Sequence, residues 1–197
     1  MLNKDQVYDF LTLFRFLNFE DIYKLSRLAR YRKLKAGDLF IELGSEKRKV
    51  AYIQQGIMRA YFIREDGEER THFFAKEKEP IGSIEVLLEN QASTQVIEAL
   101  EDCKIWEVDY DLLQDFLDRH PKFEKARKHM LQDMIVRSSK RIKSFVVNTP
   151  EERYLHLLEQ GDIVGRVQDK HLASFLGITP VSLSRIRKRL AEKSSAT

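Results

Sequence analysis

The chain has 197 residues, 43% of them hydrophobic, and a formal net charge of +3. This length accommodates one medium domain and one small domain. A single cysteine, Cys103, allows no intrachain disulfide and cannot supply the thiolates of a zinc or iron–sulfur site. No apolar run approaches the roughly 20 residues of a membrane helix, and the first residues lack the apolar core of a signal peptide, so we expect a cytoplasmic protein.

Positive charge is concentrated toward the C-terminal part of the chain. Residues 1–118 carry 17 basic and 23 acidic side chains, residues 119–143 carry nine and two, and residues 144–197 carry eight and six. A basic segment attracts DNA because binding releases counterions from the phosphates, whereas an acidic segment is repelled. The charge distribution therefore favours nucleic-acid binding by the rear of the chain.

Residues 1–118 are expected to form a sensor domain of short strands with flanking helices. Apolar residues recur at helical spacing over residues 3–30, which indicates two short helices with a break near Asn18. From residue 32 to residue 109, β-like runs alternate with turn signals, and Asp66-Gly67 joins two alternating strands in a hairpin. The expected fold class is α+β, with an N-terminal β-roll or sandwich.

A long dimerisation helix is predicted over residues 119–147. One stripe of apolar residues at near-heptad spacing consists of Phe123, Met130, Leu131, Met134, Ile135, Ile142 and Phe145, with the small Ser138 in the seam. Such a stripe packs either on its own domain or on a second copy of the chain. We favour a second copy, because a two-fold dimer presents two DNA-reading helices to two half-sites.

Residues 148–197 are expected to form a helix-turn-helix domain. Thr149, Pro150 and Glu152 form a capping-box start for a helix, and residues 161–167 follow as a short connection or strand. The apolar residues at helical spacing that form the core of two further helices are Leu172, Ala173, Leu176, Leu183, Ile186 and Leu190. Ala173 is small enough for the two helices to approach closely.

The turn between these two helices has its own sequence signals. Gly177 lies where the chain leaves the first helix at a position that favours positive φ. Thr179 can cap the second helix, and Pro180 occupies its first turn, where a missing N–H costs nothing. The second helix is therefore expected to begin sharply at this point.

The exposed face of the second helix is predicted to contact DNA. Hydroxyl and basic side chains hydrogen-bond phosphates, and arginine also pairs with guanine. The candidate DNA-binding residues are Lys170, Thr179, Pro180, Val181, Ser182, Ser184, Arg185, Lys188 and Arg189. The alternative for this stretch is an ordinary helical hairpin with a solvated charged face.

The order of a β-roll, a long helix and a C-terminal helix-turn-helix resembles the cyclic-AMP receptor and fumarate–nitrate regulator (CRP/FNR) family of bacterial transcription factors. The most specific stretches are HLASFLGITPVSLSRIRKRL at 171–190 and IGSIEVLLENQASTQVIEAL at 81–100, where the family keeps its phosphate-binding cassette. The resemblance implies a homodimer on a pseudo-palindromic promoter site in double-stranded DNA, with RNA polymerase as a further partner. Since the sequence ends seven residues after Leu190, the family's usual strands beyond the recognition helix are expected to be missing or reduced.

The resemblance also implies roles for single residues of the second helix. Arg185 matches the family's main guanine-contacting arginine, and Thr179 and Ser182 match phosphate contacts. Pro180 and Val181 fall on two further base-contacting positions but cannot make the polar contacts usual there. We therefore expect a different operator, with Val181 against a thymine methyl.

The sensor departs from the cyclic-nucleotide binders of the family. In those proteins a glutamate follows the cassette glycine and contacts the ribose, and an arginine eleven residues after that glycine pairs with the cyclic phosphate; here Ser83 and Ser93 stand at these positions. A buried phosphate without its guanidinium loses a charge-assisted pair, so we do not expect ordinary cyclic-AMP binding. Glu85 could reach a ribose only if the loop were re-registered. The resemblance still places a pocket, open to another anionic effector, at Gly82, Ser83, Glu85, Ser93, Thr94, Arg137 and Ser138.

Other chemistries lack the residues that they require. A cupin-type metalloenzyme needs two or three histidines and a carboxylate, and His72 is the only histidine in the β region. The sequence has no Gly-rich phosphate loop and no nucleophile elbow, so no enzymatic activity, metal or cofactor is expected. Cys103 and Trp106 are expected to pack inside the roll. The alternative to a regulator is a ligand-binding or interaction module whose helix-turn-helix docks a protein partner.

Overall fold

The computed structural model describes residues 19–159, 161 and 163–195. The first of the two predicted N-terminal helices lies outside these residues. The described chain separates into two compact units. One holds the described residues up to Ala60 together with Phe74–Asp133, and the other holds Tyr61–Phe73 together with the described residues from Met134 onward.

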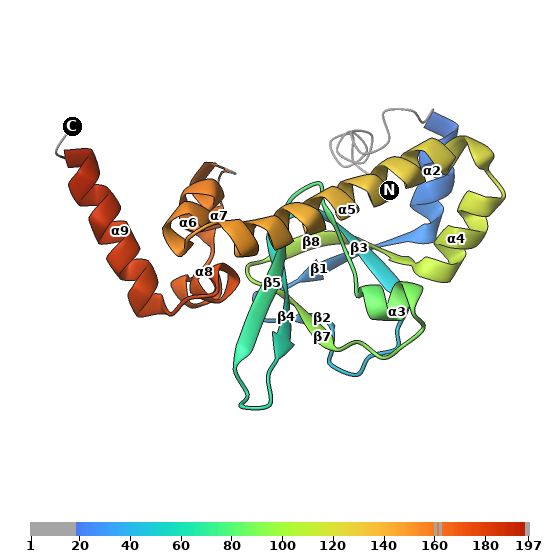
Figure 1. Ribbon diagram of the computed structural model, residues 1–197. Coiled ribbons are helices and arrows are strands. Elements are labelled where there is room, and N and C mark those ends of the chain that lie inside the picture. The colour runs from blue at the N-terminus through green and yellow to red at the C-terminus, as the bar shows by residue number, and fades with distance from the viewer. Residues whose placement is uncertain (1–18, 160, 162, 196–197) are drawn as a thin grey trace. The chain divides into compact units, whose positions relative to one another are not determined.

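The strands form two four-stranded sheets, with the orders β1-β8-β3-β6 and β2-β7-β4-β5 (Figure 1). The strands are β1 Ala29–Leu34, β2 Leu39–Ile41, β3 Lys49–Gln55, β4 Met58–Ile63, β5 Glu69–Ala75, β6 Pro80–Ile81, β7 Gln95–Ala99 and β8 Cys103–Asp109. In the first sheet, β8 pairs antiparallel with both β1 and β3, so that Trp106 lies opposite Tyr31 and Tyr52. The predicted α+β fold with a β-roll is confirmed.

The core of the roll is built from the inward-facing positions of these strands. Ile53 of β3, Ile97 of β7 and Ile105 of β8 are completely buried. Cys103 and Trp106 are buried too, as expected. Burial raises the pKa of the Cys103 thiol to about 12, so the thiol stays protonated and behaves as a small apolar group.

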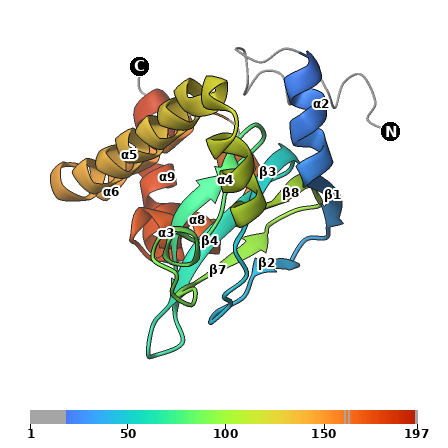
Figure 2. The same ribbon diagram turned by 90° about the vertical axis from the view of Figure 1, so that its right-hand side faces the viewer.

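Short helices adjoin the sheets of this unit. They are α2 Phe19–Leu28, α3 Ile84–Leu88 and α4 Tyr110–Asp118. Figures 1 and 2 show α2 running directly into β1, and β8 running directly into α4. The predicted helical stretch to residue 30 is too long, because Ala29 and Arg30 already pair with β8. Asp109 caps α4 by accepting hydrogen bonds from the N–H groups of Asp111 and Leu112.

The long helix, α5, spans Glu124–Val147 and follows a 3₁₀ turn, η1, at Pro121–Phe123. The prediction that Phe123 belongs to the apolar stripe of this helix is wrong. Pro121 starts the turn ahead of α5, and Phe123 is fully buried with its ring 5.1 Å from that of Phe116 in α4. The stripe therefore begins further along the chain.

Four helices follow in the second unit: α6 Pro150–Glu159, α7 Ile163–Arg166, α8 Asp169–Leu176 and α9 Pro180–Ser195. The predicted capping box is confirmed: Thr149 N–H donates to Glu152 Oε2 at 2.7 Å, and Glu152 N–H donates to Thr149 Oγ1 at 3.3 Å. The prediction of a connection or strand over residues 161–167 is wrong. A helical turn forms there because it buries both Ile163 and Val167, which are joined by a backbone hydrogen bond of 3.0 Å.

Candidate nucleic-acid interface and effector pocket

A left-handed glycine makes the turn between α8 and α9. Gly177 has φ of 71°, and Ile178 N–H donates to the carbonyl of Ala173 at 3.0 Å, a Schellman-type end to α8. A β-carbon on Gly177 would lie only 2.9 Å from the Phe145 ring. Both the backbone conformation and the available space therefore require glycine, and the positive φ confirms the prediction from the sequence.

The start of α9 is fixed by its own side chains. Thr179 Oγ1 accepts a hydrogen bond from Ser182 N–H at 3.2 Å and lies 3.0 Å from Ser182 Oγ. Pro180 is the first residue of the helix, where its missing N–H leaves no intrahelical bond unmade. The predicted cap and start are confirmed.

The two helices meet across the predicted core. Leu172, Ala173, Leu176, Leu183 and Ile186 are all buried, whereas Leu190 is half-buried. His171 is buried beside them, a position to which the sequence reading gave no role. Burial of this one apolar face leaves the opposite face of α9 in solvent.

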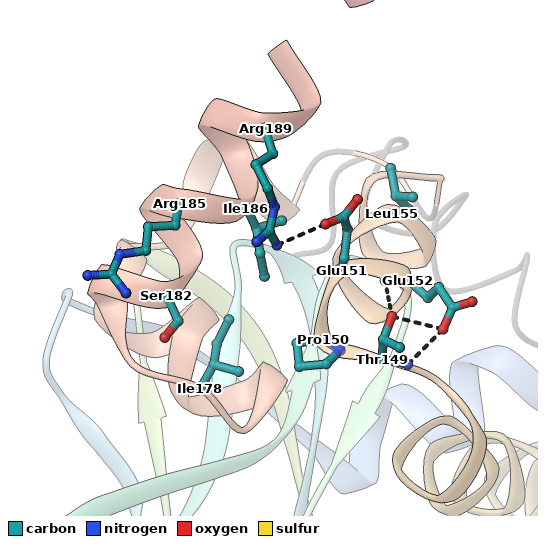
Figure 3. Close-up of a pocket in the computed structure, with 10 residues that line it drawn as sticks. All are labelled: Thr149, Pro150, Glu151, Glu152, Leu155, Ile178, Ser182, Arg185, Ile186 and Arg189. Atoms are coloured by element: carbon teal, nitrogen blue, oxygen red, sulfur yellow. Dashed lines mark hydrogen bonds and ion pairs between the residues drawn. The ribbon is translucent and has the colours of Figure 1, made fainter. Parts of the chain in front are cut away.

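Most of the predicted DNA-binding residues are exposed. Those on or beside α9 are Thr179, Pro180, Val181, Ser184, Arg185, Lys188 and Arg189, with Ser182 half-buried; Lys170 is exposed at the start of α8. Figure 3 shows the Arg185 side chain pointing away from α6. The turn and cap thus present a basic, hydroxyl-bearing helical surface that can donate hydrogen bonds to phosphates and bases.

Arg189 of the candidate set forms an ion pair with another helix of the protein. Its guanidinium lies 2.9 Å from Glu151 of α6 (Figure 3). Lys193 Nζ lies 2.9 Å from the same carboxylate. The hydrogen bond and charge of Lys193, reinforced by Arg189, lower the pKa of Glu151. Glu151 lines an open groove of about 700 Å³ between α6 and α9. The sequence reading missed Glu151, since its partners lie 38 and 42 residues away.

Arg187 has a structural role on the same helix. It donates from Nε to the Tyr154 hydroxyl of α6 at 3.0 Å and from Nη1 to Asp169 of α8 at 2.6 Å. These contacts tie α9 to both helices on which it packs. Counting basic residues along the sequence does not separate Arg187 from the exposed cations.

Two further arginines fix the end of α8 and were also missed. Arg153 donates to the carbonyl of Leu176 at 2.9 Å and to that of Asn148 at 2.7 Å. Arg141 donates to the carbonyl of Phe175 and lies 4.2 Å from the Phe145 ring centroid. Burial, with a smaller contribution from the charge of Arg153, lowers the pKa of Arg141 to about 10.

Four of the residues predicted for an effector pocket, Ser83, Glu85, Ser93 and Thr94, lie together in the first unit. Ser83 Oγ donates to Glu85 at 2.7 Å, Thr94 Oγ1 donates to the other oxygen of that carboxylate at 2.7 Å, and the Ser93 and Ser83 hydroxyls lie 2.9 Å apart. A β-carbon on Gly82 would lie 2.9 Å from Leu87, so the loop packs closely there. Arg137 and Ser138 lie on α5 in the second unit, and their assignment to the pocket stays a prediction.

The Glu85 carboxylate is ionised through its hydrogen bonds. Burial, the largest influence, raises its pKa, but donors from Thr94, its own backbone, Ser83 and Gln95 together outweigh burial and lower the pKa to about 2. No cationic side chain is among these causes. The cassette therefore holds a negative charge with neutral donors.

The described residues contain no group of three or more histidine, cysteine, aspartate or glutamate side chains that could hold a metal ion. His72 stacks on Phe62 with ring centroids 4.6 Å apart. Among the helices in this part of the chain, none has the length and apolarity required to span a bilayer.

Comparison with known proteins gives consistent matches. Residues 31–120 match the family model of the cyclic nucleotide-binding domain. The regulatory protein HlyX of Actinobacillus pleuropneumoniae is 22% identical over 182 residues, which are 86% of this chain and 75% of that protein. The fumarate and nitrate reduction regulatory protein of Vibrio cholerae is 24% identical over 196 residues, covering 88% of this chain and 74% of that protein.

Solved structures share the fold. FixK2 from Bradyrhizobium japonicum superposes with a TM-score of 0.72 at 16% identity, covering 84% of this chain and 86% of that chain. A CooA mutant from Carboxydothermus hydrogenoformans gives a TM-score of 0.69 at 17% identity, covering 86% and 79%.

The fold and the site define a cyclic nucleotide-binding-type β-roll followed by a helix-turn-helix. Residues 31–120 carry the cyclic nucleotide-binding domain, and over most of its length the chain is similar to regulators of the CRP/FNR type, in agreement with the resemblance of its sequence to that family. The expectation that it is a regulator and not an enzyme agrees with its relatives, which are named as regulatory proteins.

Proposed function

We propose that the chain is a homodimeric, sequence-specific DNA-binding regulator of transcription that acts in the cytoplasm. One observation carries the proposal: a glycine turn and a threonine cap present α9 with its apolar face buried and with Arg185 and Lys188 exposed. A helix of this kind fits the major groove of B-DNA, where its first turns contact base edges. The names of the relatives support the same class of function.

The proposed roles follow the chemistry of each side chain. Arg185 would donate two hydrogen bonds to O6 and N7 of a guanine, while Thr179 and Ser182 would contact phosphates. Val181 is 61% exposed in the first turn of α9, where an isopropyl group suits a thymine methyl. Lys188 would add charge near the backbone.

We propose that α5 is the dimer interface. Leu131, Ile135 and Ile142 are 43%, 67% and 65% exposed, and with Ser138 they recur at spacings of four, three and four residues. This is the a/d spacing of a pair of packed helices. Met130 and Met134 of the same helix are half-buried, so they are less exposed than the residues of this stripe. A second copy would cover an apolar stripe that a single chain leaves in water.

The proposed division of labour is a sensor at residues 1–118, a dimerisation helix at 119–147 and a DNA-binding domain at 148–197. The sensor would not take cyclic AMP in the ordinary way, since Ser93 stands where an arginine would pair with the phosphate. RNA polymerase would be a partner once the protein is bound at a promoter. These assignments rest on the resemblance and on the chemistry of the residues present.

Fluorescence anisotropy with a labelled duplex at increasing salt tests DNA binding. Each phosphate contact contributes about −0.9 to the slope of log K against log salt, so a slope of about −4 or steeper is expected for the dimer. If the protein is folded but its DNA affinity does not change with salt, the result favours the alternative, a module whose helix-turn-helix docks a protein partner.

A further inference from the structure

Three neutral donors in the cassette converge on one carboxylate. Ser83 Oγ and Gln95 Nε2 donate to Glu85 Oε2 at 2.7 and 2.9 Å, and Thr94 Oγ1 donates to Oε1 at 2.7 Å. Both carboxylate oxygens are therefore held. An ionised acceptor forms stronger hydrogen bonds than a neutral one, so the carboxylate is a good ligand for this set of donors.

The donors belong to a buried polar network that depends on this acceptor. Ser83, Ser93 and Gln95 are 1%, 2% and 3% exposed. Ser93 Oγ lies 2.9 Å from Ser83 Oγ and donates to the Gln95 backbone carbonyl at 2.8 Å, so its hydroxyl contacts both residues that carry these donors. Buried hydroxyl and amide donors without an acceptor are costly, so the network requires an anion or another acceptor at this point.

The segment that carries Glu85 is held in place by a separate contact. Arg48 donates to the carbonyls of Val86 and Leu87 at 2.7 and 3.0 Å, and its Nε donates to Asp111 at 2.8 Å. These bonds anchor the end of α3 to the start of α4. Because Arg48 anchors α3, the backbone that carries Glu85 is held next to the donors.

The charge of the site is the reverse of what an anionic effector requires. A nucleotide phosphate needs hydrogen-bond donors and a compensating positive charge, but here the donors are occupied by a negative group. A phosphate placed beside Glu85 would meet a like charge in a partly buried site, which disfavours binding.

We propose that Glu85 is a tethered ligand of the cassette: its carboxylate fills the donor set that would otherwise hold an anionic effector, so the loop is liganded without a nucleotide. The sensor then needs no cyclic nucleotide to reach its liganded arrangement. DNA binding independent of cyclic nucleotides follows, and this consequence rests on the proposed function.

Thermal unfolding of the intact chain tests the tethered ligand through chemical rescue. Glu85→Ala exposes the donors, so we expect the Tm to fall by about 4–8 °C. Sodium acetate at 0.1 M should restore about 1–3 °C relative to sodium chloride of equal ionic strength. Inorganic phosphate is the second probe. Glu89→Ala is the matched control, since Glu89 is an exposed carboxylate next to the same short helix; it should match the wild type in both salts.

The proposal can be overturned whether or not the Glu85→Ala variant folds. If the Tm of Glu85→Ala equals that of Glu89→Ala, the Glu85 carboxylate is not a ligand of the donor set. The same conclusion follows if acetate raises the Tm of the wild type and of both variants equally. If Glu85→Ala fails to fold, Glu85→Gln replaces it in the same measurement. We expect the Tm of Glu85→Gln to be lower than that of the wild type and not to respond to acetate. A Tm equal to that of the wild type overturns the proposal. A rise in the wild-type Tm with 1 mM cyclic AMP overturns it as well.

The anisotropy measurement separates this inference from the proposed function. With 1 mM cyclic AMP, the DNA affinity of the wild type should stay within twofold of its value without nucleotide, and a fivefold gain would contradict the tethered-ligand model. Absence of any DNA binding would refute the proposed function alone, because the unfolding measurements test the cassette directly.

Discussion

Arg185 and Lys188 are both exposed cations of α9, but we expect their substitution by alanine to affect DNA binding differently. Arg185→Ala should relax base preference at one position of each half-site by about 1–3 kcal/mol, since a bidentate contact to guanine is lost. Competition binding with duplexes substituted at each position measures this preference. Lys188→Ala is the control: it should weaken all duplexes about equally and reduce the salt slope by about 1 per contact. Unchanged sequence preference in Arg185→Ala would remove that residue from the base-contacting set.

Gly177 is predicted to be irreplaceable for stability. An alanine there would have to adopt φ of 71° and place its β-carbon 2.9 Å from the Phe145 ring, which costs about 1–3 kcal/mol and lowers the Tm by about 3–8 °C. Gly165→Ala is the matched control, because Gly165 lies in α7 with open space around it. Helix propensity makes that change neutral or stabilising by up to about 1 kcal/mol. Equal Tm values for Gly177→Ala and Gly165→Ala would show that position 177 tolerates a β-carbon.

Glu85 predicts a specific dependence of stability on pH. Its pKa is lowered from 4.5 to about 2 by neutral donors on Thr94, Ser83 and Gln95. Its stabilising contribution is therefore fully present above about pH 5 and is lost as the pH falls from 4.5 toward 2. In urea unfolding at pH 7, 5, 4 and 3, the difference between wild type and Glu85→Gln should shrink toward acid. For the exposed Glu89→Gln the difference should stay small, and a pH-independent difference for Glu85→Gln would contradict the model.

Single residues were predictable where local backbone geometry decides their identity. Gly177 and Thr179 follow from what a helix end and a helix start require, whatever surrounds them. The pairing of Glu151 with Arg189 and the bond from Arg153 to the Leu176 carbonyl were not predictable, because the partners lie more than 20 residues apart in the chain. Nothing in the local pattern of a charged residue states which distant carbonyl or side chain it will meet.

At the scale of whole elements, α5 carries the prediction of self-association. Ile135→Glu should weaken dimerisation by about two orders of magnitude or more, because each copy then places a charge in an apolar seam. Ser139→Glu is the control, since Ser139 is exposed one helical turn along but is outside the proposed seam. Sedimentation equilibrium over a range of concentrations measures the change. Equal association constants for the two variants would exclude α5 as the interface.

Element identity was predictable where periodicity or turn signals were strong. The strands around Asp66-Gly67, the capped start of α6 and the pair α8 and α9 all follow from such signals. Residues 161–167 are too few to distinguish a strand from a helical turn by periodicity, and burial of Ile163 and Val167 decided the outcome. Phe123 matched the spacing of α5 but packs with α4, because Pro121 interrupts the register.

For the whole molecule, the order of elements was more informative than any one of them. A β-roll, a long helix and a helix-turn-helix in sequence predicted the family that the comparisons support. The order of elements does not define an effector. The contents of the cassette depend on how Glu85, Thr94 and Gln95 come together in space, which spacing along the chain does not determine.

Selection of bound duplexes from a random pool by the intact protein tests the central claim most directly. The account predicts enrichment of two-fold related half-sites, with centres about 10 bp apart or a multiple of that distance, and a guanine preference that disappears in Arg185→Ala. Recovery of a pool no different from the input at low salt, or of sequences without two-fold symmetry, would contradict it.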